Sequence, residues 1–339
     1  MRFIAFLAVF LHHVLPRGGG NSFLLSTAAN AMGFGLCLFL VLSAYLIAML
    51  LLREREQTGS IHLVSFYTRR ILRIWPLYLL GLGIGVFRAY SHGVLDQQKT
   101  WFVAALLLAG NLVIPTSGAL MSHLWSISVE EQFYLFFPTA CKNFPRRGMF
   151  VFAIALIVMA NLALVYFVHV GAELDTTVWF SSFVQFEMFA AGILLALADA
   201  RLPRWSTPVS LLAAAASIGL WVLVDGAFHL KTAGARATSI PAACAGYALV
   251  ALSCCVFLVA MQGLSSPPAL EYAGKISFGL YVFHIPVIAL LSARLHPYPL
   301  ACVVCLAVTC GIAALSYQFY EKPFLRMKRR FELVPTRAS

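Results

Sequence analysis

The chain alternates long apolar runs with short polar stretches along its whole length. Clear apolar runs cover residues 1–15, 30–52, 71–90, 149–170, 181–199, 208–225, 239–261, 276–294 and 299–320. Most of them are close to the roughly 20 residues that an α-helix needs to cross a bilayer. The pattern therefore predicts an all-α fold, a polytopic membrane helix bundle.

Two weaker apolar runs, 101–114 and 126–140, decide how many helices cross the membrane. Each crossing changes the side of every later loop, and Lys and Arg favour the cytoplasmic loops. If one of the two runs crosses and the N-terminus is cytoplasmic, most of the 24 Lys and Arg residues lie on the cytoplasmic side. We therefore predict about ten transmembrane helices, a re-entrant segment over 101–114 and cytoplasmic positions for both termini.

The composition is that of a membrane protein. Hydrophobic residues make up 61% of the chain and charged residues 11%, whereas soluble domains carry roughly 25% charged residues. No polar block is long enough for a second domain, so we predict one membrane-embedded domain over 1–330 and a short cytoplasmic tail over 331–339. The net charge of +11 lies in short loops, which is typical of contact with a lipid bilayer and not with nucleic acid.

The eight cysteines predict no metal site. Most of them lie inside apolar runs, where Cys acts as a small apolar residue. Cys302 and Cys305 have the spacing of a metal-binding or redox pair, but no second cluster completes a zinc site.

Arg2 and His13 are the first candidates for function, because ionisable side chains inside apolar helices are costly. They are 11 positions apart, which places both side chains on one helix face, about 16 Å apart along the axis. A neutral His at this depth is suited to take a proton from an alcohol. The alternative is an Arg that reaches the membrane surface and a His that bonds to a neighbouring helix.

Three arginines, Arg69, Arg70 and Arg73, stand at the predicted cytoplasmic start of the third helix. Arg70 and Arg73 project from one face because they are three positions apart. Guanidinium groups bind phosphates through paired hydrogen bonds, which predicts a docking place for a cytoplasmic polyphosphate. The alternative is simple anchoring under the positive-inside rule.

Two adjacent carboxylates, Glu130 and Glu131, interrupt the apolar run 126–140. Adjacent helix positions differ by about 100°, so only one of the two need face His13. The sequence does not decide which one. An acidic pair at a helix start is the alternative interpretation.

Ser277, Tyr281 and His284 form one polar stripe on the run 276–294, because the spacing i, i+4, i+7 repeats on one helix face. Such a stripe is expected to face the bundle interior, either for direct chemistry or for structural hydrogen bonds. Gly81 and Gly85 have the small-xxx-small spacing that predicts a close contact between helices.

Several motifs stand in order along the chain: Arg2-x10-His13, Leu42-Ser43-Ala44-Tyr45-Leu46, Phe66-Tyr67-x-Arg69-Arg70-x-x-Arg73-Ile74-x-Pro76, His123-x-Trp125-Ser126-Ile127-Ser128-Val129-Glu130-Glu131-Gln132-Phe133-Tyr134, Tyr281-x-x-His284 and Glu321-x-Pro323-Phe324. Together they resemble the acyltransferase-3 family of bacterial integral-membrane O-acyltransferases. The likeness covers nearly the whole chain. Each motif alone is a moderate signal, and their joint order and spacing make a strong one.

The resemblance implies a multi-pass enzyme of the bacterial inner (cytoplasmic) membrane, an acyltransferase of groups other than amino-acyl groups. The expected donor substrate is cytoplasmic acyl-CoA, in particular acetyl-CoA, and no metal is expected. The expected acceptor is a hydroxyl of a carbohydrate or glycolipid of the cell envelope.

The resemblance also implies that Arg2 and His13 are essential and that Arg70 and Arg73 serve the donor. We add Arg69 to the expected donor site. Five more residues are expected to contribute to substrate binding: Ser43, Trp125, Tyr134, Tyr281 and His284.

Three departures from the family pattern bear on these expectations. Met1 directly precedes Arg2, whereas family members carry a short lead there, which puts the completeness of the first helix in question. Ser43-Ala44 replaces the usual Ser-Gly, a change expected to alter packing mildly. No extracytoplasmic hydrolase-like domain follows the last helix, so we expect the chain to act alone or with a separate extracytoplasmic partner protein.

The resulting hypothesis is an acyl transfer in which His13, oriented by a carboxylate such as Glu131, takes the proton of the acceptor hydroxyl. Arg2 either orients the donor or steadies charge near the inner mouth. A different interpretation is a transporter of polysaccharide units or small anions, and a third is a scaffold in an envelope assembly. Hydrolysis of acetyl-CoA or transfer from it would favour the enzyme.

Overall fold

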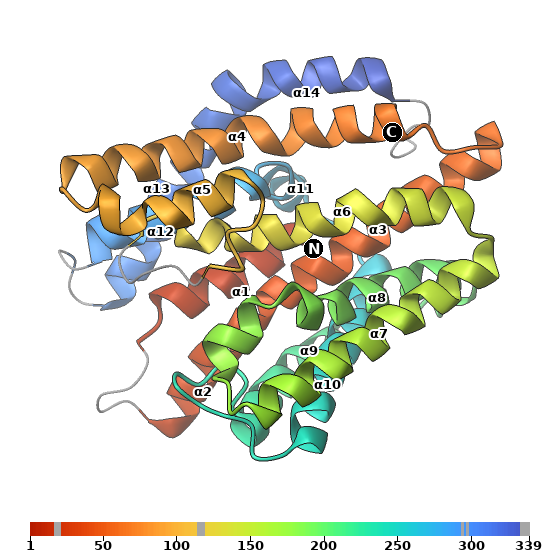
Figure 1. The fold of residues 1–339 in the computed structure, drawn as a ribbon, viewed down its shortest axis with the longest axis horizontal. Coiled ribbons are helices and arrows are strands. Elements are labelled where there is room, and N and C mark those ends of the chain that lie inside the picture. The colour runs from red at the N-terminus through yellow and green to blue at the C-terminus, as the bar shows by residue number, and fades with distance from the viewer. Residues whose placement is uncertain (17–21, 114–118, 293–294, 296–297, 333–339) are drawn as a thin grey trace. The chain divides into compact units, whose positions relative to one another are not determined.

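A computed structural model describes residues 1–16, 22–113, 119–292, 295 and 298–332 (Figure 1). Every regular element within these ranges is helical, and the only extended pairing among them is an isolated bridge between Glu173 and Arg236. The predicted all-α fold is therefore confirmed. Residues 333–339 of the predicted tail lie outside the described residues, as do Arg17, Arg294 and Arg337, which contribute to the predicted charge bias.

The helices gather into two compact units. Unit 1 consists of Met1–Met49 and Phe144–Gly274, and unit 2 consists of Leu50–Asn143 and Lys275–Ser339. Each unit is thus built from two separate stretches of the chain. The predicted boundary of one membrane domain over 1–330 stays a prediction.

Unit 1 contains the first helices and a central group of long ones. Its elements are α1 (Arg2–Val14), α2 (Phe23–Ala31), η1 (Met32–Phe34), the first part of α3 (Gly35–Thr58), α7 (Arg146–His169), η3 (Leu174–Val178), α8 (Ser182–Ala198), η4 (Asp199–Arg201), α9 (Thr207–Phe228), α10 (Ile240–Gln262) and most of α11 (Pro268–Lys275). Helix α10 packs against α7, α8 and α9, and α2 packs against α9 (Figure 1). Gly35 allows α3 to approach α1 closely, since a Cβ there would lie 2.7 Å from the Ala8 Cβ of α1.

Unit 2 contains the remaining part of α3 and the last helices of the chain. Its other elements are α4 (Leu63–Ser91), α5 (Leu95–Leu106), η2 (Ser122–Leu124), α6 (Trp125–Asn143), α12 (Ser277–Leu291), α13 (Tyr298–Ser316), η6 (Tyr317–Glu321), α14 (Lys322–Lys328) and η7 (Arg329–Phe331). Helix α4 is central to this unit, because α5, α6, α12 and α14 all contact it (Figure 1).

The predicted glycine contact on α4 is confirmed. A Cβ at Gly81 would lie 3.1 Å from Val282 of α12, and a Cβ at Gly85 would lie 2.9 Å from the ring of Phe102 of α5. Gly83, between them, has nothing within 4 Å of such a Cβ. The small residues of the motif therefore face helices, and the intervening glycine does not.

The hydropathy of the helices is that of a membrane protein. Among the described residues, six helical segments are long and apolar enough to span a bilayer, and a seventh arises if the bent pair α11 and α12, which meet at 71°, forms one span. Helices α1 and α8 are apolar but shorter. The prediction of a helical protein with membrane spans is confirmed.

Helix α5 ends within the run 101–114, and the re-entrant segment over 101–114 stays a prediction. Leu108 adopts a positive φ of 57°. Its carbonyl accepts a hydrogen bond from Gln132 Nε2 at 2.8 Å, and the Gly110 N–H donates to Ser128 Oγ at 3.2 Å. Helix α6 therefore satisfies the polar backbone of this segment, which irregular backbone at membrane depth needs.

Candidate functional site

The predicted site residues divide between the two units. Arg2, His13 and Ser43 belong to unit 1, and the remaining ones belong to unit 2. Each group is described within its own unit.

Helix α1 runs without a break from Arg2 to Val14, so the periodicity that places Arg2 and His13 on one face holds along its length. Both side chains are half-buried, whereas the neighbouring His12 is buried. His12 Nδ1 lies 2.9 Å from the Ala29 carbonyl of α2. Because a carbonyl only accepts, Nδ1 carries the proton in this bond. His12 therefore fixes the end of α1 that carries His13.

A buried lysine, Lys231, lies beside His12, and no motif of the sequence pointed to it. A Cβ at Gly33 would lie 3.1 Å from Lys231 Cε and 3.2 Å from the His12 ring. Lys231 Nζ lies 3.9 Å from the centre of the Trp179 ring, a cation–π contact. Its backbone N–H donates to Asp225 Oδ1 at 2.7 Å. The absence of a side chain at Gly33 makes room for the His12 ring and the lysine stem.

Ser43 is buried on α3, two residues before Tyr45. The Tyr45 hydroxyl donates to Asp199 Oδ1 and accepts from Gln262 Nε2 at 2.8 Å. These bonds join α3 to η4 and to the end of α10. The substrate-binding role of Ser43 stays a prediction.

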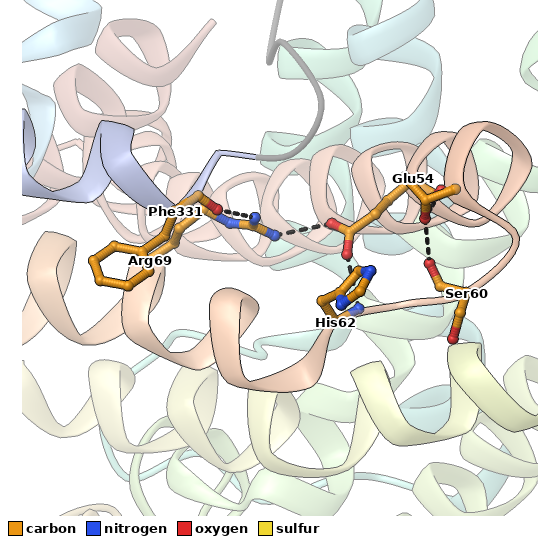
Figure 2. Close-up of polar contacts among 6 residues, drawn as sticks. Glu54, Ser60, His62, Arg69 and Phe331 are labelled. Atoms are coloured by element: carbon orange, nitrogen blue, oxygen red, sulfur yellow. Dashed lines mark hydrogen bonds and ion pairs between the residues drawn. The ribbon is translucent and has the colours of Figure 1, made fainter.

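The three arginines of α4 have different surroundings in unit 2. Arg69 is buried and points toward α3 and η7 (Figure 2). Its Nη2 lies 3.0 Å from Glu54 Oε2, and its Nη1 donates to the Phe331 carbonyl at 2.7 Å. The other carboxylate oxygen of Glu54 accepts the backbone N–H of His62 at 2.9 Å (Figure 2). Arg69 is thus neutralised inside the unit.

Arg70 and Arg73 are half-buried. The Arg70 guanidinium carbon lies 5.5 Å from the centre of the Phe66 ring and 5.3 Å from the centre of the Tyr134 ring. Contact with ring faces holds the plane of a guanidinium while its N–H groups point outward from its edge. This arrangement suits recognition of an anion by Arg70.

The two adjacent glutamates of α6 are half-buried and have different partners. Glu131 Oε2 accepts the Trp75 indole N–H at 3.1 Å, and its Oε1 is buried with no hydrogen-bond partner in the described part of the chain. Glu130 accepts a hydrogen bond from the Tyr134 hydroxyl. The positive charge of Arg70 also acts on Glu131. Glu131 therefore has one carboxylate oxygen that is not committed to a hydrogen bond within the described residues.

The polar stripe of α12 is buried, and hydrogen bonds join it to the start of α6. The Tyr281 hydroxyl donates to the His123 carbonyl at 2.7 Å and lies 2.6 Å from Ser126 Oγ. His123 Nε2 lies 3.1 Å from the Tyr281 carbonyl, and His284 Nδ1 lies 2.6 Å from the same oxygen. The structural alternative for the stripe is thus visible, while a role of Tyr281 or His284 in substrate binding stays a prediction.

Trp125 is buried at the first position of α6, and Tyr134 lies two and a half turns further along the same helix. His123 belongs to the same sequence motif but was not among the predicted site residues. It is buried and hydrogen-bonded to Tyr281. In the described residues, no three side chains of His, Cys, Asp or Glu gather closely enough to hold a metal ion.

The apolar helices, long enough to span a bilayer, define a polytopic membrane protein. The model of the acyltransferase domain family matches residues 1–317. The chain therefore belongs to the acyltransferase-3 family, and the predicted family and enzyme class are confirmed.

The similar proteins are bacterial. A Staphylococcus aureus protein named "Putative O-acetyltransferase SACOL0978" is 25% identical over 355 residues, which cover 96% of this chain and 56% of the relative. The O-acetyltransferase OatA of S. aureus strain MRSA252 is 22% identical over 380 residues, which cover 100% of this chain and 58% of OatA. The chain spans little more than half the length of these relatives. No solved structure matches it.

Proposed function

We propose that the protein is a membrane-bound O-acetyltransferase that moves an acetyl group from cytoplasmic acetyl-CoA to a hydroxyl of a carbohydrate or glycolipid. Membership of the family and the O-acetyltransferase names of its relatives support the reaction class. The observation that carries the donor assignment is the contrast among the arginines. Arg69 is paired with Glu54, whereas the Arg70 guanidinium lies over the rings of Phe66 and Tyr134.

In this proposal Arg70 and Arg73 bind phosphates of the donor, because guanidinium groups match phosphate oxygens in paired hydrogen bonds. Arg69 keeps α4 in place, and direct contact of Arg69 with the donor stays a prediction. The roles of Trp125 and Tyr134 in substrate binding also stay predictions.

His13 is the proposed general base. The acceptor hydroxyl oxygen attacks the thioester carbonyl carbon as His13 takes the hydroxyl proton. The carbon–sulfur bond then breaks, and the sulfur of coenzyme A leaves with the proton that His13 returns. General base catalysis contributes about 10²–10⁴-fold in rate. Arg2 is proposed to orient the donor or to stabilise charge during this step.

The proposed topology has about ten spans and both termini in the cytoplasm of a bacterium, with the protein in the inner membrane. A donor of cytoplasmic origin then meets the start of α4 directly. The acceptor is proposed to be a polysaccharide or glycolipid of the cell envelope, and a separate extracytoplasmic protein is a proposed partner. Nothing in the family membership supports the transporter or the scaffold.

The test of the reaction is transfer from radiolabelled acetyl-CoA by the purified full chain in detergent. We expect His13→Ala to lower turnover by about 10²-fold or more, whereas His169→Ala, which changes an exposed histidine at the end of α7, leaves it unchanged. Equal turnover of wild type and His13→Ala would remove the base assignment. Absence of any transfer or hydrolysis by wild type, with every acceptor offered, would remove the proposed reaction.

A further inference from the structure

Two hydrogen bonds hold the segment that contains α14 along the first half of α4. At one end the Tyr320 hydroxyl donates to the Pro76 carbonyl at 3.1 Å. At the other end Arg69 Nη1 donates to the Phe331 carbonyl at 2.7 Å (Figure 2). The two helices lie side by side between these bonds (Figure 1). Residues of α14 are thus held at fixed positions next to the arginines of α4, although α14 lies beyond the residues that the family model matches.

Lys328 differs from the arginines of this segment. Arg326, Arg329 and Arg330 are exposed, whereas only 17% of the Lys328 side chain is accessible. Its Nζ lies 3.3 Å from Glu332 Oε1, whose side chain is 28% accessible. The pair has the i,i+4 spacing of helix ion pairs, which contribute about 0.3–0.5 kcal/mol to stability. The ion pair with Glu332 therefore does not by itself explain why Lys328 is half-buried.

Lys328 lies on the segment that packs along the arginine-bearing part of α4. The positive charges of Arg73 and Arg70 both act on its ammonium group. Cations that approach one another in a half-buried place repel, and the arrangement is favourable once an anion lies among them. The positive charge of Arg73 also acts on the carboxylate of Glu321, and that of Arg70 acts on the carboxylate of Glu131, so acidic groups lie near these cations as well.

We propose that Lys328 is a third cationic ligand of the donor phosphates and acts together with Arg70 and Arg73. This inference rests on the proposed function, because the ligand is the phosphate-bearing part of acyl-CoA. Two guanidinium groups supply planar forks and Lys328 supplies a compact point charge, a combination that suits a substrate with several phosphate groups. When the donor binds, its phosphate replaces Glu332 as the partner of Lys328.

The test measures binding of coenzyme A to the purified full chain by isothermal titration calorimetry. Loss of one charged hydrogen bond weakens binding by about tenfold or more, so we expect that increase in Kd for Lys328→Gln and a smaller one for Lys328→Arg. Arg326→Gln removes the same charge from the exposed face of α14 and should leave Kd within about twofold of wild type. Equal Kd values for wild type and Lys328→Gln would overturn the proposal.

Glu332→Gln separates a ligand from a structural lysine. If Lys328 served only its ion pair with Glu332, both variants would weaken binding alike, and that result would also overturn the proposal. As a phosphate ligand, Lys328 loses a competitor in Glu332→Gln, so coenzyme A should bind as tightly as to wild type or more tightly. Repetition with 3′-dephospho-coenzyme A identifies the phosphate: the effect of Lys328→Gln disappears if the 3′-phosphate is its partner and persists if the diphosphate is.

Failure of this inference and failure of the proposed function give different results. Tight binding to wild type that is weakened in Arg70→Gln but not in Lys328→Gln supports the donor site and removes Lys328 from it. Absence of any binding of coenzyme A to wild type removes the donor itself, and the role of Lys328 with it.

Discussion

Arg69 of α4 and Glu54 of α3 form a buried ion pair, with 3.0 Å between Nη2 and Oε2. Both side chains have further hydrogen bonds, to the Phe331 carbonyl and to the His62 N–H, so each charge is well compensated (Figure 2). Arg69 thereby joins α4 both to α3, which precedes it, and to the end of the described chain. This pairing holds the helix from which Arg70 and Arg73 project.

Removal of one charge of this ion pair should destabilise the protein more than removal of both charges. Glu54→Gln leaves the buried guanidinium of Arg69 without its counter-charge and should cost about 3–5 kcal/mol of unfolding free energy. The combined change Glu54→Leu with Arg69→Met should cost less than either single charge removal. Thermal unfolding in detergent measures both effects.

The matched control for the ion pair is the exposed pair Lys99–Asp96, with 3.1 Å between Nζ and Oδ1. Asp96→Asn should leave the melting temperature unchanged, because exposed ion pairs contribute little. A melting temperature of Glu54→Gln that matches that of Asp96→Asn would contradict the structural role of Arg69.

The two glutamates of α6 should differ in catalysis. We expect Glu131→Gln to lower kcat more than Glu130→Gln does, because Glu130 pairs with Tyr134 whereas one oxygen of Glu131 has no hydrogen-bond partner in the described residues. If Glu131 acts through His13, the double variant with His13→Ala should be no slower than His13→Ala alone, since the effects of residues that work as one unit are not additive. Additive losses in a kinetic double-mutant cycle would show that Glu131 acts independently.

Helix α4 provides a matched pair of glycines. Gly85→Ala should destabilise the protein by about 1–3 kcal/mol, because its Cβ would approach the Phe102 ring to 2.9 Å. Gly83→Ala on the same helix meets nothing within 4 Å and should be neutral or stabilising by up to about 1 kcal/mol. Thermal unfolding of both variants measures the difference, and equal destabilisation by the two would contradict a close contact between Gly85 and Phe102.

His12 and His13 should affect different properties of the protein: His12 its thermal stability and His13 its turnover. His12→Ala removes the 2.9 Å hydrogen bond to the Ala29 carbonyl and should lower the melting temperature. His12→Asn offers a shorter donor and should restore part of the loss. His13→Ala, in contrast, should retain the melting temperature while turnover falls. A fall in melting temperature for His13→Ala as large as that for His12→Ala would assign His13 to structure.

The apolar pattern predicted the spanning helices well where lipid contact sets the composition. The run 239–261 corresponds to α10, and the run 208–225 corresponds to α9. Charged helix ends were less predictable. The run 30–52 stops at Arg53, whereas α3 continues to Thr58. The helix continues because Glu54, which an apolar scale counts against it, is buried against Arg69.

The site was predictable as motifs but not as contacts. Three neighbouring arginines look alike in sequence, and only a partner 15 positions earlier and a carbonyl 262 positions later set Arg69 apart. The choice between Glu130 and Glu131 depends in the same way on Trp75 and Tyr134. Such distant partners leave no local pattern, so spacing alone does not reveal them.

The interleaving of the two units has a consequence for biosynthesis. All the stretches of unit 1 have been synthesised once Gly274 is made, whereas unit 2 still lacks α12, α13 and α14 at that point. Because chains are made from the N-terminus at a limited rate, α4 lacks its contacts with α12 and α14, and Arg69 lacks its bond to the Phe331 carbonyl, until the last helices arrive. Nascent chains halted between these two points should therefore expose the Arg69 side of α4 to proteases or chaperones, and completed chains should protect it.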